Sequence, residues 1–122
     1  MPEKRILLVD DEASTSQLLA NLLRVEGYAV DAAATFAEAM GCLDKTSYAL
    51  VIADWRLPDG DGFIVAETAA ARGAKTLLMS GYLFQMPQGT AGRYETLMKP
   101  LRPSEIVAAV ERSIGGAGVS RA

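Results

Sequence analysis

The sequence predicts an α/β fold, in which helices cover both faces of one doubly wound, five-stranded parallel sheet. Short apolar runs of strand length alternate along the chain with longer segments of helical periodicity. The runs, such as ILLV at 6–9 and LVIA at 50–53, are apolar throughout, which is typical of strands buried on both faces. Acidic and polar residues follow where these runs end, at the edge where such sheets carry their functional sites.

The first strand–helix unit lies at the N-terminus. Arg5–Val9 is an apolar run of strand length, and Ala13–Glu26 has the periodicity of a helix that stops before Gly27. The residues predicted on the buried face of this helix are Leu18, Leu19, Leu22 and Val25.

The second and third units repeat this order. Tyr28–Ala33 is predicted as a strand and Phe36–Leu43 as a helix, on which we expect the lone Cys42 to face the core. Ala49–Ala53 is the third predicted strand, and the alanine-rich segment Phe63–Arg72 is a helix ending at a glycine. A third βα unit of this kind makes a parallel sheet the natural arrangement.

The C-terminal part supplies two more strands, Lys75–Met79 and Glu95–Met98, and a last helix over Pro103–Ile114 with proline in its first turn. A fourth helix would be expected between these two strands. The segment there, GYLFQMPQGTAGRYE at 81–95, contains proline and glycines and has poor helical periodicity. We therefore predict a short, frayed or absent fourth helix.

Length and composition predict one domain over residues 1–114, with the glycine-rich segment 115–122 as a flexible tail or truncated linker. The 12 basic and 15 acidic residues give a net charge of -3, so neither nucleic acid nor a membrane surface is an expected partner. The N-terminus resembles neither a signal peptide nor a spanning helix, which predicts a cytoplasmic protein. The absence of histidine argues against a zinc site or a Ser/His/Asp triad.

Candidate functional residues follow the ends of four predicted strands. Asp10 and Asp11 follow the first strand, Asp54 the third, Ser80 the fourth and Lys99 the fifth. If the strand order is 2-1-3-4-5, the first and third strands are neighbours and their three aspartates meet. Clustered carboxylates repel one another unless a cation joins them, and Mg²⁺ favours such oxygen ligands together with phosphate. The cluster therefore predicts a magnesium-dependent phosphoryl site with Asp54 as nucleophile.

Four motifs, ILLVDDE at 6–12, DWRLPDGDG at 54–62, LLMSGY at 77–82 and MKP at 98–100, resemble in order and spacing the receiver domain of two-component response regulators. The resemblance implies a flavodoxin-like, CheY-like fold with strand order 2-1-3-4-5. It implies that Asp54 is the phosphoacceptor, that Asp11 binds Mg²⁺ directly, and that Asp10 binds it largely through water. The further roles that it implies are a backbone carbonyl ligand at Arg56, a switch hydroxyl at Ser80, a phosphate-pairing lysine at Lys99, and a cis bond before Pro100.

A receiver of this kind would take a phosphoryl group from a histidine kinase or a histidine phosphotransfer protein. Its output would pass to a downstream protein through the surface of the fourth and fifth strands and the last helix. It would be a signalling domain that catalyses only its own phosphorylation and dephosphorylation. Receivers usually have Tyr or Phe three residues before the lysine, whereas this chain has Thr96, and either Tyr82 or Tyr94 would have to replace that ring.

Three other interpretations remain beside a stand-alone regulator. The chain would fit a receiver excised from a hybrid histidine kinase, or a pseudo-receiver that binds partners without phosphorylation. A phosphatase-like enzyme with a covalent aspartate usually needs a DxD arrangement on the first strand, and the order Asp10, Asp11, Glu12 does not supply one.

Overall fold

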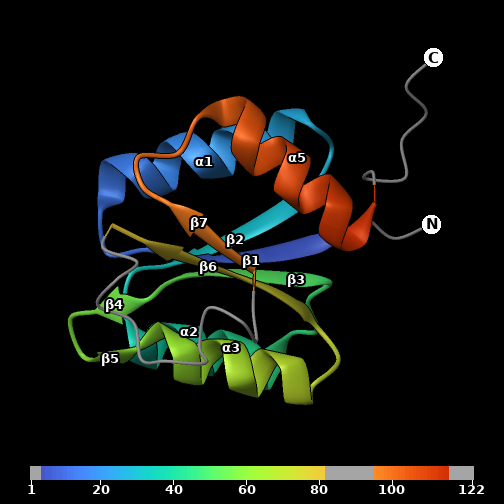
Figure 1. The fold of residues 1–122 in the computed structure, drawn as a ribbon. Coiled ribbons are helices and arrows are strands. Elements are labelled where there is room, and N and C mark those ends of the chain that lie inside the picture. The colour runs from blue at the N-terminus through green and yellow to red at the C-terminus, as the bar shows by residue number, and fades with distance from the viewer. Residues whose placement is uncertain (1–3, 82–94, 116–122) are drawn as a thin grey trace.

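The sheet is parallel throughout and has five strands in the order β2-β1-β3-β6-β7 (Figure 1). The computed structural model describes residues 4–81 and 95–115. The strands of this sheet are β1 (Arg5–Val9), β2 (Ala29–Ala33), β3 (Leu50–Asp54), β6 (Lys75–Ser80) and β7 (Glu95–Met98). If β6 and β7 are counted as the fourth and fifth strands of this sheet, the order is 2-1-3-4-5, as predicted.

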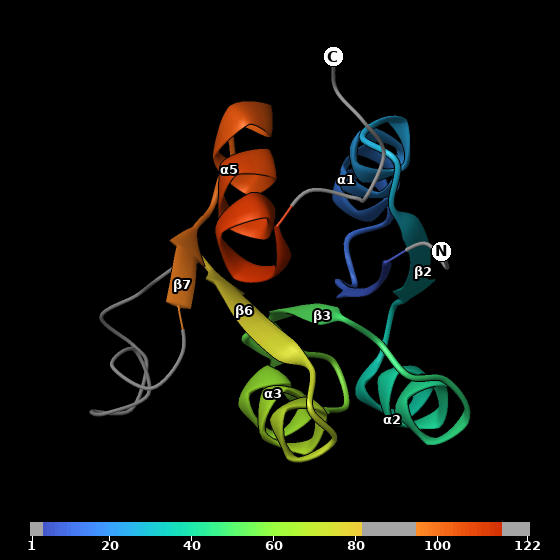
Figure 2. The same ribbon diagram turned by 90° about the vertical axis from the view of Figure 1, so that its right-hand side faces the viewer.

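Four helices within the described residues cover the two faces of the sheet (Figures 1 and 2). They are α1 (Ala13–Val25), α2 (Phe36–Lys45), α3 (Gly62–Ala71) and α5 (Pro103–Ile114). α1 and α5 lie on one face, and α2 and α3 lie on the other. No helix in the described part of the chain is both long and apolar enough to cross a membrane.

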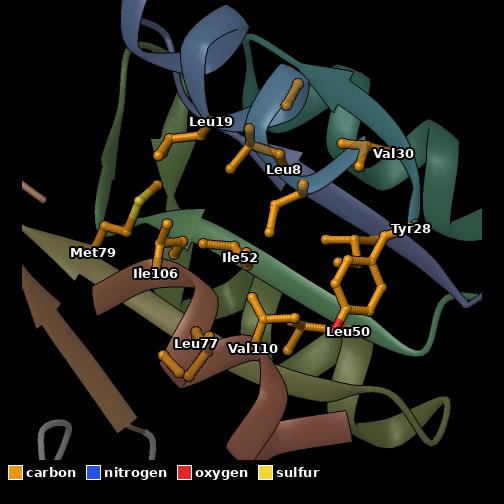
Figure 3. Close-up of a cluster of buried hydrophobic side chains, with 14 residues drawn as sticks. Leu8, Leu19, Tyr28, Val30, Leu50, Ile52, Leu77, Met79, Ile106 and Val110 are labelled. Carbon is orange, nitrogen blue, oxygen red and sulfur yellow. The ribbon is translucent and has the colours of Figure 1, made fainter. Parts of the chain in front are cut away.

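The strands are apolar throughout because the two faces of the sheet bury alternate side chains. Ile6 and Leu8 point into the core beneath α1 and α5, and Leu7 and Val9 point into the core beneath α2 and α3. Figure 3 shows the first of these cores, where Leu19 of α1 and Ile106 of α5 meet strand residues. These two cores fix the strands, and the strands in turn position the side chains at the carboxyl edge of the sheet.

Predicted and observed element boundaries agree to within two residues, which is the ordinary uncertainty of helix and strand ends. The burial predicted for α1 is wrong in part. Leu18 and Val25 are 63% and 82% exposed, and the residues buried under α1 are Ser16, Leu19, Ala20 and Leu23. Small side chains at two of these positions allow α1 to lie close to the sheet, so the distribution of large apolar residues did not indicate the buried face. The predicted core residue Cys42 is half-buried.

A second sheet, which the sequence did not predict, is a two-stranded antiparallel hairpin of β4 (Arg56–Leu57) and β5 (Gly60–Asp61). It lies between β3 and α3, next to the sheet's carboxyl edge (Figure 1). The prediction of a short or absent fourth helix falls largely on residues 82–94, outside the described residues. The same holds for Tyr82, for Tyr94 and for residues 116–122 of the predicted tail.

Tyr48, at the end of the α2–β3 connection, links that connection to β2. Its hydroxyl donates a hydrogen bond of 2.7 Å to Asp31, and the ring packs into the core beneath α2 and α3. Burial, followed by this hydrogen bond and the negative charge of Asp31, raises the Tyr48 pKa well above its ordinary value.

We expect Tyr48→Phe to make the protein less sensitive to alkaline pH. A phenol whose pKa is raised by folding stabilises the fold fully below its unfolded pKa of about 10, and this contribution is lost as pH rises through the folded pKa. The difference in unfolding free energy between wild type and Tyr48→Phe should therefore be about 1 kcal/mol near neutral pH. It should decrease from pH ~10 upward. Urea denaturation over that pH range measures it, and a constant difference would contradict the assignment.

Candidate functional site

The centre of the site is one ammonium group that lies between two carboxylates. Asp10 comes directly after β1, and Asp54 is the last residue of the neighbouring strand β3. Lys99 comes directly after β7, and its Nζ donates to Asp10 Oδ2 at 3.1 Å and to Asp54 Oδ2 at 3.0 Å. The parallel sheet thus brings residues 89 positions apart into contact at one edge.

Asp10 is the most buried member of this group. Its side chain is fully buried, compared with exposures of 13% for Asp54 and 21% for Lys99. The other carboxylate oxygen of Asp10, Oδ1, accepts a hydrogen bond from the backbone N–H of Glu12 at 2.9 Å. The backbone N–H of Asp10 donates to the carbonyl oxygen of Ala33 at 3.0 Å. Both carboxylate oxygens are therefore satisfied, and the residue is fixed between β2 and the start of α1.

Asp11 completes an acidic cluster. One carboxylate oxygen from each of Asp10, Asp11 and Asp54 lies within 4.8 Å of the others, and Asp11 is exposed. Such an oxygen-only set, open to solvent on one side, suits a hard cation that keeps some of its waters. The donors present therefore fit Mg²⁺, in agreement with the expectation from the sequence.

The electrostatics of Asp54 and Lys99 reflect this crowding. Burial raises the pKa of Asp54, the hydrogen bond and charge of Lys99 oppose the rise, and the charges of Asp10 and Asp11 add to it. Burial lowers the pKa of Lys99, but hydrogen bonds to and charges on Asp54 and Asp10 outweigh burial, so that its pKa is raised overall. Lys99 is thus held as an ammonium ion beside negative charge.

The remaining predicted residues lie on β6, on the hairpin after β3, and on β7. Ser80 ends β6, next to Met79, which is the strand partner of Asp54, and its side chain is buried. Its backbone carbonyl accepts the Lys99 N–H at 2.9 Å, and the Lys99–Pro100 peptide bond is cis, as predicted. Arg56 begins β4 and is exposed, with its guanidinium 5.3 Å from the centre of the Trp55 ring. Thr96 lies on β7 opposite Leu78 of β6.

Two hollows lie near the site, one beside Asp10 and Asp11 and the other beside Lys99. One of about 420 Å³ is lined by Asp10 and Asp11 together with alanines of α1 and β2. The other, of about 490 Å³, lies beside Lys99 and is lined by Leu18, Leu19 and Leu101. The hollow beside Lys99 therefore has an apolar margin, and Asp11 is the exposed carboxylate of the cluster.

Residues of the loop after Asp54 also shape the site, and the sequence did not assign them a role. A Cβ atom at Gly62 would lie 1.9 Å from the carbonyl oxygen of Asp54, so only glycine fits beside the Asp54 backbone. Asp59, at the tip of the hairpin, accepts the backbone N–H groups of Phe36 and Ala37 at the start of α2. The motif PDGDG signalled a turn, but nothing in it indicated a contact with a helix that begins 23 residues earlier.

The chain belongs to the response regulator receiver domain family, since residues 6–111 match that family. Among curated proteins, the transcriptional regulatory protein ResD of Bacillus subtilis is 34% identical over 113 residues, which are 89% of this chain and 47% of ResD. The chain spans about half the length of ResD and of the next curated relative. It spans 6% of a hybrid signal transduction histidine kinase of Dictyostelium discoideum that is 29% identical over 123 residues, 85% of this chain.

Solved receivers have the same fold. A CheY-like receiver domain protein of Methanospirillum hungatei is 27% identical and superposes with a TM-score of 0.85, covering 93% of this chain and 94% of its own. The response regulator TrrA of Thermotoga maritima, solved in complex with Mg²⁺ and BeF, is 30% identical with a TM-score of 0.79, covering 89% and 97%. The flavodoxin-like architecture inferred from the motifs is therefore confirmed, and this chain is a receiver domain of two-component signalling.

Proposed function

We propose that this receiver accepts a phosphoryl group on Asp54 in the presence of Mg²⁺. The observation that carries the proposal is the position of Asp54, whose carboxylate lies 3.0 Å from the Lys99 ammonium and within 4.8 Å of the Asp10 and Asp11 oxygens. A nucleophilic carboxylate, a fixed cation and a further carboxylate pair are what phosphoryl transfer to an aspartate requires. The relative solved with Mg²⁺ and BeF supports the same chemistry.

Asp10, Asp11 and Asp54, with the backbone carbonyl of Arg56, would hold the magnesium ion. When bound, the ion supplies positive charge that neutralises the carboxylates and the incoming phosphoryl oxygens. Once Asp54 is phosphorylated, the Lys99 ammonium would pair with the phosphoryl oxygens instead of the two carboxylates, because it already contacts Asp54. The Ser80 hydroxyl, at the end of the adjacent strand, would donate a hydrogen bond to a phosphoryl oxygen.

In the reaction, an Asp54 carboxylate oxygen attacks phosphorus and forms an O–P bond as the P–N bond of a phosphohistidine breaks. The leaving imidazole nitrogen keeps the bonding electron pair and takes a proton. The donor would be a histidine kinase or a histidine phosphotransfer protein. The output would be a downstream protein that binds the surface of β6, β7 and α5 after Ser80 has moved toward the phosphoryl group.

The assignment covers residues 1–114 as the receiver domain and 115–122 as a tail or a linker to another part of a longer protein. A receiver that belongs to a hybrid histidine kinase would use the same chemistry. A pseudo-receiver would not, and the complete set of Asp10, Asp11, Asp54, Ser80 and Lys99 argues against that alternative.

Incubation with Mg²⁺ and phosphoramidate tests the proposal by intact mass. We expect one phosphoryl adduct on the wild type, because ammonia can leave as the P–N bond breaks, and none on Asp54→Asn, whose amide is a poor nucleophile. Asp44→Asn is the matched control, since Asp44 is an exposed carboxylate that pairs with Arg72 away from the site. An adduct that persists on Asp54→Asn, or the absence of an adduct on the wild type, would refute the proposal.

A further inference from the structure

The hairpin that carries Arg56 is attached to the rest of the domain at its tip. Asp59 Oδ1 accepts the Phe36 N–H at 2.7 Å, and Asp59 Oδ2 accepts the Ala37 N–H at 3.1 Å. These are the first two N–H groups of α2, which have no partner within the helix. The Asp59 pKa is lowered, mainly by the Phe36 N–H, so the side chain binds as a carboxylate.

The rest of the helix start is satisfied locally. Thr35 Oγ1 accepts the Glu38 N–H at 3.1 Å, and the Ala39 N–H donates to the Thr35 carbonyl at 3.0 Å. The N-terminus of α2 is therefore capped both by Thr35, its neighbour in the chain, and by Asp59 of the hairpin. Gly60 allows the approach, because a Cβ atom there would lie 2.5 Å from the Phe36 ring.

Both ends of this connection lead to the acidic cluster. On the hairpin, Asp59 is three residues from Arg56, whose partner across the hairpin is Asp61. On the other side, the segment before α2 contains Ala33, whose carbonyl accepts the backbone N–H of Asp10. Asp59 thus joins the main chain at Arg56 to the segment that fixes Asp10.

We propose that Asp59 is a positioning residue for the magnesium site, acting through the hairpin and touching neither the ion nor the phosphoryl group. By holding the hairpin on α2, Asp59 would limit movement of the Arg56 main chain relative to the segment that carries Asp10. This inference rests on the proposed function, because it concerns the affinity of the same site for Mg²⁺.

Magnesium titration followed by Trp55 fluorescence tests the inference at constant ionic strength. For Asp59→Ala we expect the dissociation constant for Mg²⁺ to rise about tenfold, as for other groups that support metal ligands. Amide hydrogen exchange should become faster at Phe36 and Ala37. Asp59→Asn has no charge and keeps one acceptor oxygen for the two N–H groups, so its dissociation constant for Mg²⁺ should lie between those of the wild type and Asp59→Ala.

Thr35→Ala is the matched control, since it removes a cap from the same helix without releasing the hairpin. It should lower the denaturation midpoint about as much as Asp59→Ala does, with a dissociation constant within about twofold of the wild type. Equal weakening by Thr35→Ala, an unchanged constant in Asp59→Ala, or unchanged exchange at the two amides would each overturn the inference. If instead the wild type takes up no phosphoryl group and shows no saturable response to Mg²⁺, the proposed function itself fails.

Discussion

Gly62→Ala is expected to destabilise the protein by about 3 kcal/mol or more and to displace Asp54. The added methyl group would lie 1.9 Å from the Asp54 carbonyl oxygen and 2.8 Å from the Asp54 carbonyl carbon. These are backbone atoms at the end of a buried strand, and no side-chain rotation relieves the overlap. The Gly62 N–H also donates to the Trp55 carbonyl at 2.8 Å, so a shift of Gly62 breaks this hydrogen bond as well.

The expected destabilisation comes from the steric overlap with the Asp54 backbone and not from an unfavourable φ angle. Among the glycines described, positive φ angles occur at Gly27, Gly73 and Gly115, and Gly62 is not one of them. Gly41→Ala is the control, because Gly41 is inside α2 and an added Cβ would meet nothing within 4 Å. It should stabilise the protein by about 0.5 to 1 kcal/mol. Urea denaturation of both variants measures the contrast, and a loss below about 1 kcal/mol in Gly62→Ala would show that the loop gives way.

The sheet and the place of the site were predictable because they depend on local chemistry. Strands such as Ile6–Val9 are apolar on both faces, and that pattern alone indicates a covered parallel sheet. Polar residues directly after such strands must lie at the carboxyl edge. Asp10 and Asp54 could therefore be placed together once the order of strands was inferred from the receiver motifs.

What the sequence did not predict depends on contacts between distant segments. The buried stripe of α1 includes Ser16 and Ala20, whose small size matters only because the sheet lies close beneath them. The cap that Asp59 supplies to α2, and the need for glycine at position 62, likewise arise from chain segments that meet only in the folded protein. Neither propensity nor periodicity carries such information.

Lys99→Ala should have the second large effect, a loss of about 3 kcal/mol in the absence of Mg²⁺. The substitution removes the cation shared by Asp10 and Asp54 and leaves their carboxylates facing each other, with Asp10 fully buried. This value is at the low end for breaking buried ion pairs, because Lys99 is 21% exposed and water can enter. Arg102→Ala is the control, since the Arg102–Glu105 pair is exposed and 3.9 Å apart, and it should cost less than about 0.5 kcal/mol.

Magnesium should reverse much of the loss in Lys99→Ala. A ligand that binds only the folded state stabilises it by an amount that grows with its affinity. Without the competing ammonium, the three carboxylates should bind a divalent cation more tightly than in the wild type, so saturating Mg²⁺ should raise the denaturation midpoint more in the variant. A smaller rise in Lys99→Ala would mean that Lys99 supports metal binding instead of competing with it.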